Sequence, residues 1–266
     1  MSELVKRILF AVPAAAIFIW ITWLGGNAFQ TMIFAIGLLT VWEIHNIMKA
    51  AGRADYFPIS LLLVVMIWRT DFMPDWLLLS AVMVVLLITI WAVFDKKHEA
   101  SGRWLSTLFT GIYAPVGFLM VIYIREMVPG AAGFWLTLSL FFMIWGNDVF
   151  AYFGGKTFGK RKLAPVISPN KTWEGFWFGF LGAAIGFLIA WALADPFPLP
   201  LSSIFISVII VSIAGPIGDI TESRLKRIAG VKDSSSLLPG HGGFFDRFDS
   251  LILAAPFIFF YFFMTI

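Results

Sequence analysis

Four aspartates have the type and placement to do chemistry in this sequence: Asp148, Asp219, Asp246 and Asp249. Asp148 and Asp219 lie near the ends of long apolar stretches, where an acid is costly and usually marks function. Asp246 and Asp249 stand three residues apart, so on a helix they share a face. Carboxylates that converge from different helices offer the oxygen ligands that a hard cation such as Mg²⁺ prefers. The aspartates therefore indicate a divalent-cation site where several helices end.

Glu43 is a further acid within an apolar stretch, and His45 follows two residues later. Such a carboxylate can also be structural, as the acceptor of a hydrogen bond between helices or as a helix cap. For Glu43 we favour this structural interpretation. For Asp148 and Asp219 we favour a functional one, because each adjoins a loop that is rich in polar groups, and function concentrates in such loops.

Residues 154–162 form a polar stretch that combines glycines with four basic residues. Glycines let backbone amides approach an anion, and the basic side chains neutralise it. The stretch lacks the residue order of a Walker A loop, so that motif is excluded. Two interpretations stay open: an anion-binding loop, or the basic anchor of a membrane helix.

Residues 168–172, Ser-Pro-Asn-Lys-Thr, are expected to open the helix that we predict at 174–194. Ser168, Lys171 and Thr172 would then lie beside a helix N-terminus. The free N–H groups and the helix dipole favour an anion there, so this stretch is expected to form a phosphate site.

The segment from 223 to 249 is the richest in polar side chains. It holds five basic residues, three aspartates and one histidine, His241. Its basic residues can neutralise phosphates, and its aspartates can bind the cation that accompanies a polyphosphate. For His241 two interpretations stay open: a loop residue that is fixed by a hydrogen bond, or a catalytic residue.

Composition indicates a membrane protein. Of the 266 residues, 60% are hydrophobic and only 13% are charged, roughly half the charged share of a soluble domain. Most of the surface must therefore face lipid. The absence of cysteine excludes disulfides and thiolate metal sites. The apolar stretch at 8–24 resembles a signal peptide, but we expect a retained helix, because no cleavage site is evident and further apolar stretches follow at once.

A helix needs about 20 apolar residues to cross the hydrocarbon of a bilayer. We therefore expect an all-α, polytopic membrane protein with nine spans in a single domain, 1–266. The third span is short, so eight spans are the alternative. The expected spans are 8–24, 28–48, 57–68, 76–94, 104–124, 133–153, 174–194, 202–219 and 250–266.

The distribution of basic residues orients these spans. With the N-terminus in the cytoplasm and the C-terminus outside, every lysine and arginine except Arg69 and Arg125 falls on the cytoplasmic side. The positive-inside rule requires such a partition, and removing one span spoils it. The aspartates and the polar loops then face the cytoplasm, so we expect an active site on that face of the inner (plasma) membrane.

The order of residues from 223 to 249 resembles the signature of the phosphatidate cytidylyltransferases, also called CDP-diacylglycerol synthases. Residues 148–156, 168–175 and 218–223 are similar to that family as well. The resemblance covers about 140–255, the expected catalytic portion, whereas the first 130 residues match only as apolar spans. The matching positions of the signature are Ser223, Leu225, Lys226, Arg227, Lys232, Asp233, Ser235, Leu238, Pro239, His241, Gly242, Gly243, Asp246, Arg247 and Asp249.

The resemblance implies transfer of the CMP moiety of CTP to phosphatidate, giving CDP-diacylglycerol and pyrophosphate, with Mg²⁺ as cofactor. We expect in-line attack by the lipid phosphate on the α-phosphorus, because no side chain is an evident nucleophile. The expected catalytic residues are Asp219, Asp246, Lys171, Lys226, Arg227 and His241. The expected substrate-binding residues are Ser168, Thr172, Ser223, Arg224, Lys232 and Arg247. The expected metal ligands are Asp219 and Asp246 first, then Asp148 and Asp249.

Two other classes of protein fit the same residues less well. A transferase that joins a sugar phosphate to a polyprenyl phosphate would also use aspartates at the membrane edge with Mg²⁺. An ion-coupled transporter would use Asp148 and Glu43, but transporters often show internal repeats and midplane charges. Here no repeat is visible and the charges gather at one face. Besides CTP, phosphatidate and the bilayer, we expect no nucleic-acid partner, and a homodimer is a candidate assembly.

Overall fold

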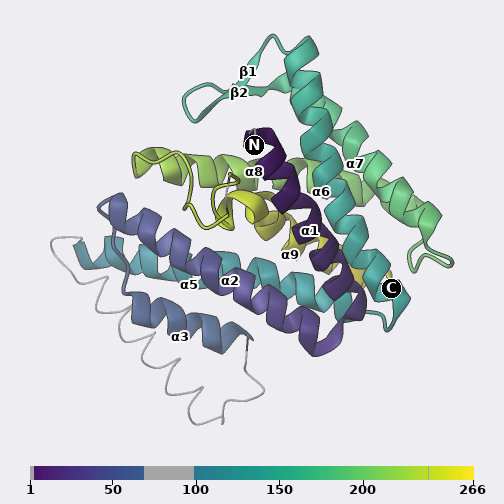
Figure 1. Ribbon diagram of the computed structural model, residues 1–266, viewed down its shortest axis with the longest axis horizontal. Coiled ribbons are helices and arrows are strands. Elements are labelled where there is room, and N and C mark those ends of the chain that lie inside the picture. Colours follow the sequence, from purple (N-terminus) through teal and green to yellow (C-terminus); the bar gives the residue numbers. More distant parts are fainter. Residues whose placement is uncertain (1–2, 69–98, 239) are drawn as a thin grey trace.

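The computed structural model describes residues 3–68, 99–238 and 240–266, and most of these residues are helical (Figure 1). Apolar stretches become helices because a helix satisfies its backbone hydrogen bonds internally, as lipid requires. In chain order the elements are α1 (Glu3–Leu24), α2 (Gly26–Ala50), α3 (Phe57–Trp68), α5 (Glu99–Glu126), α6 (Ala131–Phe158), β1 (Lys162–Ala164), β2 (Ser168–Thr172), α7 (Trp173–Leu193), the 3₁₀ turn η2 (Leu201–Ser203), α8 (Ile204–Ile228) and α9 (Phe245–Thr265).

The helices confirm a helical membrane protein. Within the described residues, six stretches are long and apolar enough to cross a bilayer: α2, α5 from Ser101, α6, α7, η2 with α8, and α9. The apolar part of α1 and the whole of α3 are shorter. The span expected at 76–94 lies outside the described residues. The count of nine spans and the orientation therefore stay predictions.

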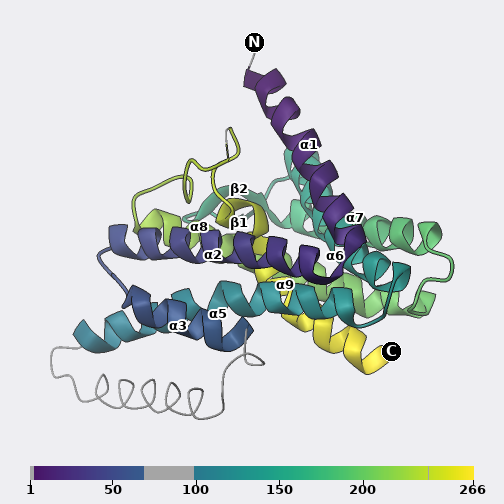
Figure 2. The ribbon, with the colours of Figure 1, turned by 60° about the horizontal axis from the view of Figure 1, so that its bottom comes forward.

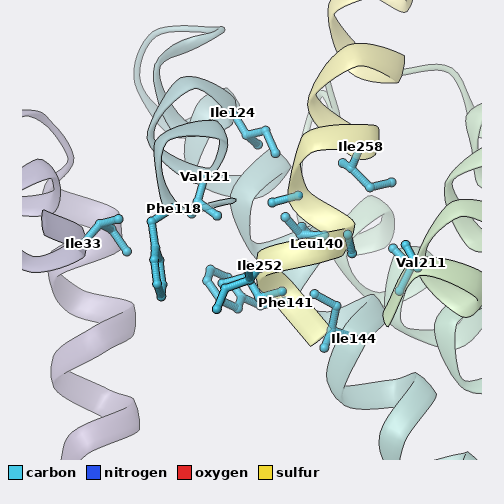
Figure 3. Packing of buried hydrophobic residues seen from close by; sticks show 14 of the residues in the cluster. Ile33, Phe118, Val121, Ile124, Leu140, Phe141, Ile144, Val211, Ile252 and Ile258 are labelled. Carbon is cyan, nitrogen blue, oxygen red and sulfur yellow. The ribbon is translucent and has the colours of Figure 1, made fainter. Parts of the chain in front are cut away.

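Helix α9 lies at the centre of the packing. Its buried side chains Ile252 and Ile258 face apolar residues of α5, α6 and α8, among them Phe118 (Figure 3). In a membrane such packing contacts, rather than exclusion of water, favour association of helices. Because α9 packs against several helices, its N-terminal end is held in place as well, and this end carries Asp246 in the first turn and Asp249 three residues later.

Glycines allow α6 to lie directly against α7. A Cβ atom at Gly146 would overlap the carbonyl oxygen of Gly182, and a Cβ atom at Gly182 would overlap that of Gly146. Gly186 stands in the same relation to Phe142 further along the pair. Small residues are the usual means by which membrane helices approach closely. The two helices run antiparallel, so the end of α6 that carries Asp148 lies beside the start of α7.

A two-stranded hairpin joins α6 to α7, with β1 antiparallel to β2 (Figure 1). Residues 168–172, which were expected to open the next helix, form a strand, so the expectation is wrong for Ser168 and Lys171, and only Thr172 lies at the helix N-terminus. The physical reason is Pro169, which has no N–H to donate and which drives the preceding residue into an extended conformation. Ser168 therefore lies in a strand and not at a helix N-terminus.

Helix α7 begins directly after β2, and Thr172 caps it. The Thr172 hydroxyl accepts a hydrogen bond from the backbone N–H of Gly175 at 3.1 Å. A cap of this kind contributes about 1 kcal/mol. Glu174, in the first turn, accepts from the backbone N–H groups of Lys160 and Arg161 at 3.0 and 3.2 Å. The base of the hairpin is thereby tied to the start of α7.

Arg125 of α5 joins the helix ends that lie farthest from the hairpin. Its guanidinium donates to the carbonyl oxygens of Thr22 at 2.7 Å, Trp23 at 3.1 Å and Gly130 at 3.4 Å. The last turn of α1, the last turn of α5 and the start of α6 therefore meet, whereas the N-terminal part of α1 projects beyond the other helices (Figure 2). Arg125 is buried in this role, as a cap for the end of α1.

Candidate active site

A cavity of about 720 Å³ lies where α6, α7, α8, α9 and the hairpin meet. All four aspartates that the sequence singles out line it. Acids and bases placed together around a polar cavity suit a polyanion that is bound with a cation. The acidic residues that line the cavity are Asp148, Asp219, Glu222, Asp233, Asp246 and Asp249, and the basic ones are Lys156, Lys162, Lys171, Lys226 and Arg247.

Three carboxylates converge within the cavity: Asp219 and Glu222 of α8, and Asp249 of α9. Each offers one oxygen, and these oxygens lie within 4.8 Å of one another. Asp219 and Glu222 share a helix face because they stand three residues apart. Helix α9 can approach that face because residue 218 is glycine; a Cβ atom there would overlap the Asp249 carbonyl oxygen. Hard oxygen ligands and negative charge make this cluster a fit for Mg²⁺.

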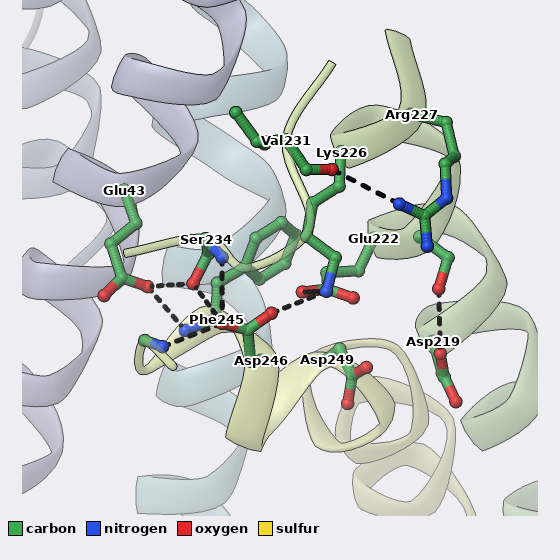
Figure 4. A network of polar contacts seen from close by, with 12 residues as sticks. Glu43, Asp219, Glu222, Lys226, Arg227, Val231, Ser234, Phe245, Asp246 and Asp249 are labelled. Carbon is green, nitrogen blue, oxygen red and sulfur yellow. Dashed lines mark hydrogen bonds and ion pairs between the residues drawn. The ribbon is translucent and has the colours of Figure 1, made fainter. Parts of the chain in front are cut away.

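Glu222 was not among the ligands expected from the sequence. Its spacing from Asp219 was a signal that could have found it, since residues three apart on a helix are neighbours. Glu222 is buried, and its Oε1 pairs with Lys226 Nζ at 2.7 Å. The same Nζ lies 2.6 Å from Asp246 Oδ1. Lys226, expected as a catalytic residue, thus links two carboxylates that line the cavity (Figure 4).

Asp246 lies in the first turn of α9, three residues before Asp249, but its carboxylate points toward the loop between α8 and α9. Its Oδ2 accepts from the backbone N–H groups of Ser234 at 2.9 Å and Gly243 at 2.7 Å. Its Oδ1 pairs with Lys226. Asp246 therefore lines the cavity beside the three-carboxylate cluster without being part of it.

Lys171 reaches the cluster from the hairpin. Its Nζ lies 2.6 Å from Asp219 Oδ2, and the hydroxyl of Ser223 donates to Asp219 Oδ1 at 3.2 Å. Lys171 and Ser223, both expected site residues, therefore hold the Asp219 carboxylate between a strand and its own helix. The ion pair also brings β2 over the cavity.

Asp148 lines the cavity from α6. The preceding residue, Asn147, holds α6 in place against α8. Asn147 is buried, and its side-chain amide donates to Ser212 Oγ of α8 at 3.0 Å. A buried hydrogen bond between polar side chains fixes one arrangement of two helices. Asn147 thus holds the Asp148 segment against α8.

A second hollow of about 480 Å³ is formed by the loop between α8 and α9. His241 and Lys232, both expected from the sequence, line it. Asp233 and Arg247 line this hollow and the main cavity alike, so the two spaces adjoin. The backbone N–H of His241 donates to Leu238 O at 2.8 Å, which helps to fold the loop.

Three of the expected residues line neither space: Ser168, Arg224 and Arg227. Ser168 pairs with Ala164 at the far end of the hairpin. Both arginines are exposed on α8, and Arg227 Nη1 donates to Val231 O at 3.4 Å just beyond the helix. The geometry gives these three side chains no contact with the carboxylate cluster.

The structural interpretation of Glu43 is confirmed. Its buried carboxylate accepts hydrogen bonds from the backbone N–H groups of Phe244 and Phe245 and so caps the start of α9. His45 turns elsewhere and pairs with the buried carboxylate of Asp55.

Comparison with known proteins gives one consistent family. The model of the Cytidylyltransferase family matches residues 5–265. A phosphatidate cytidylyltransferase of Bacillus subtilis (strain 168) is 35% identical over 272 residues, 98% of this chain and 98% of that protein. Proteins of the same name from Brucella abortus (strain 2308) and Pseudomonas aeruginosa are each 35% identical, over 97% and 88% of this chain and 93% and 87% of theirs. The similarity includes the first half of the chain.

Proposed function

This chain belongs to the cytidylyltransferase family, and we propose that it transfers the CMP moiety of CTP to phosphatidate, giving CDP-diacylglycerol and pyrophosphate. The observation that carries the proposal is the similarity, over nearly the full length, to proteins named phosphatidate cytidylyltransferase. The cavity supports it, because acids for a cation and bases for phosphates line one space at the ends of apolar helices.

Mg²⁺ fits the residues present. Asp219, Glu222 and Asp249 supply three oxygens close together, and we propose them as its ligands. Asp148 and Asp246 line the same cavity, so both are further candidates. A bound Mg²⁺ would neutralise charge on the reacting phosphates and favour departure of the leaving group.

The chain's own residues then position two anions. An oxygen of the lipid phosphate forms the new bond to the α-phosphorus of CTP, and the bond from that phosphorus to the bridging oxygen breaks, releasing pyrophosphate. Lys171 and Arg247 line the cavity and are suited to hold these phosphates, together with Lys156 and Lys162. Such catalysis consists mainly of positioning and charge stabilisation, so no protein nucleophile is needed.

The location of the substrates favours a site on the cytoplasmic face of the plasma membrane. CTP is dissolved in the cytoplasm and phosphatidate lies in the bilayer, so the site must be open to both. The candidate site is formed where α6 and α8 end and α7 and α9 begin. Assembly as a homodimer stays a prediction.

One assay tests the proposal. Purified protein in detergent micelles receives CTP labelled at the α-phosphate, phosphatidate and Mg²⁺, and the lipid phase is analysed for labelled CDP-diacylglycerol. Product is expected, and it should need both phosphatidate and Mg²⁺. A folded, monodisperse protein that forms no lipid-linked CMP would overturn the proposal. A parallel reaction with polyprenyl phosphate and a nucleotide sugar tests the alternative transferase.

A further inference from the structure

Glu43 of α2 is fully buried, and four neutral donors surround its carboxylate. Oε1 accepts from Ser235 Oγ at 2.6 Å and from the backbone N–H of Phe244 at 3.0 Å. Oε2 accepts from Ser234 Oγ at 2.9 Å and from the backbone N–H of Phe245 at 2.7 Å. A buried carboxylate is costly unless it is hydrogen-bonded, and the donors placed around Glu43 meet that need.

The four donors belong to two adjoining parts of the candidate site. Phe244 and Phe245 begin α9, where the first N–H groups have no partner within the helix and the helix dipole attracts negative charge. Ser234 and Ser235 belong to the loop that leads from α8 to α9. One side chain of α2 thus fixes both the loop and the turn that carries Asp246.

Ser234 connects Glu43 directly with Asp246 (Figure 4). Its hydroxyl lies 2.9 Å from Glu43 Oε2 and 2.8 Å from Asp246 Oδ2, and its single proton can go to either. Its backbone N–H donates to Asp246 Oδ2 at 2.9 Å. From Asp246 the chain of contacts continues through Lys226 to Glu222, one of the three clustered carboxylates.

Two glycines of the loop, Gly242 and Gly243, make these contacts possible. A Cβ atom at Gly243 would overlap Ser234 Oγ and Glu43 Oε1, so a larger residue would push the carboxylate away. Gly242 has φ of 78°, a conformation that L residues rarely adopt. Two adjacent glycines therefore let the loop close over Glu43 and turn a backbone N–H toward Asp246.

We propose that Glu43 is a positioning residue for the transfer reaction. Through Ser234 and the start of α9, it holds Asp246 and the Asp246–Lys226–Glu222 contacts in place beside the cation-binding carboxylates. The inference rests on the proposed function and goes beyond it. It assigns a role in the reaction to a residue of α2, a helix that contributes no side chain to the lining of the cavity.

Three variants test the proposal. Glu43→Gln keeps the size of the side chain but turns N–H donors toward groups that are themselves donors. Ser234→Ala removes the hydroxyl that connects the two carboxylates. Asp55→Asn is the matched control: Asp55 is also buried and also holds α2, through His45. Asp55 accepts a hydrogen bond from Ser60, and none of these three residues lines the cavity.

We expect Glu43→Gln to lower kcat about 10- to 100-fold, the range typical of residues that orient metal ligands without binding the metal themselves. The variant should also need a higher Mg²⁺ concentration for half-maximal rate. The KM for phosphatidate should stay near the wild-type value. Ser234→Ala should lower kcat and raise the Mg²⁺ requirement to a smaller extent. The double variant of Glu43→Gln with Ser234→Ala should have a kcat no lower than that of Glu43→Gln alone. Asp55→Asn should lower Tm while leaving kcat and the Mg²⁺ requirement near wild type.

Hydrogen exchange gives a second readout that needs no turnover. Backbone amides of residues 230–248 should exchange faster in Glu43→Gln than in Asp55→Asn, with α6 and α7 unchanged. The proposal is overturned if Glu43→Gln matches Asp55→Asn in exchange and in rate per folded molecule. Wild-type turnover is measured first; if it is absent, the proposed function fails, and the exchange pattern still decides whether Glu43 holds the loop.

Discussion

The two aspartates near the start of α9 have different surroundings. Asp246 accepts from two backbone N–H groups and pairs with Lys226, whereas Asp249 faces two further carboxylates. We expect Asp246→Asn to lose product formation and about 1–3 kcal/mol of stability, because the amide has one acceptor oxygen where the carboxylate has two, so the donors to the other oxygen lose their acceptor. Asp249→Asn should lose product formation but keep its stability, because it removes repulsion between like charges. Thermal unfolding beside the CTP assay checks both.

The effect of Mg²⁺ on Tm tests whether Asp249 binds the cation. A ligand that binds the folded state raises Tm by mass action. Mg²⁺ should therefore raise the Tm of the wild type and have less effect on Asp249→Asn, since one of the three clustered carboxylates is replaced by a neutral amide. An equal rise in both proteins would remove Asp249 from the cation site.

At the residue scale, sequence reasoning found the carboxylates but not their contacts. Asp148, Asp219, Asp246 and Asp249 were conspicuous because acids are rare beside apolar stretches. The direction in which Asp246 points depends on donors from a loop 12 residues away in sequence. The donors to Glu43 lie 191 to 202 residues away, so no local pattern could have indicated them.

At the element scale, the approach of α8 to α9 forms the carboxylate cluster. Gly218 allows it, because a Cβ atom there would overlap the Asp249 carbonyl oxygen. We expect Gly218→Ala to cost about 1–3 kcal/mol through overpacking, and to reduce product formation because the helices must separate at Asp219 and Asp249. Detergent-based thermal unfolding and the CTP assay measure the two effects.

Gly215 provides the matched control on the same helix. A Cβ atom at Gly215 would meet Ser250 Cβ at 3.6 Å, an ordinary contact. Gly215→Ala should therefore be neutral, or stabilising by up to about 1 kcal/mol through helix propensity, with activity kept. If both alanine variants behave alike, close approach at Gly218 is not what forms the cluster.

Elements could be predicted where a long apolar stretch defined them. The stretches 133–153 and 174–194 correspond closely to the apolar parts of α6 and α7. The hairpin was missed because its strands are short and polar and carry no alternation of apolar residues. Pro169 was the local signal against a helix at 168–172, because the residue before a proline is driven into an extended conformation.

At the scale of the whole molecule, the site gathers at one end of the helices, and the basic residues predict that this end faces the cytoplasm. Because the chain has no cysteine, single cysteines can report each face. Val166 at the hairpin tip is 82% exposed, and Ser202 before α8 is exposed as well. In right-side-out vesicles an impermeant maleimide should label Ser202→Cys and spare Val166→Cys, and inverted vesicles should give the reverse. Labelling of Val166→Cys from outside would reverse the orientation and place the cavity away from cytoplasmic CTP.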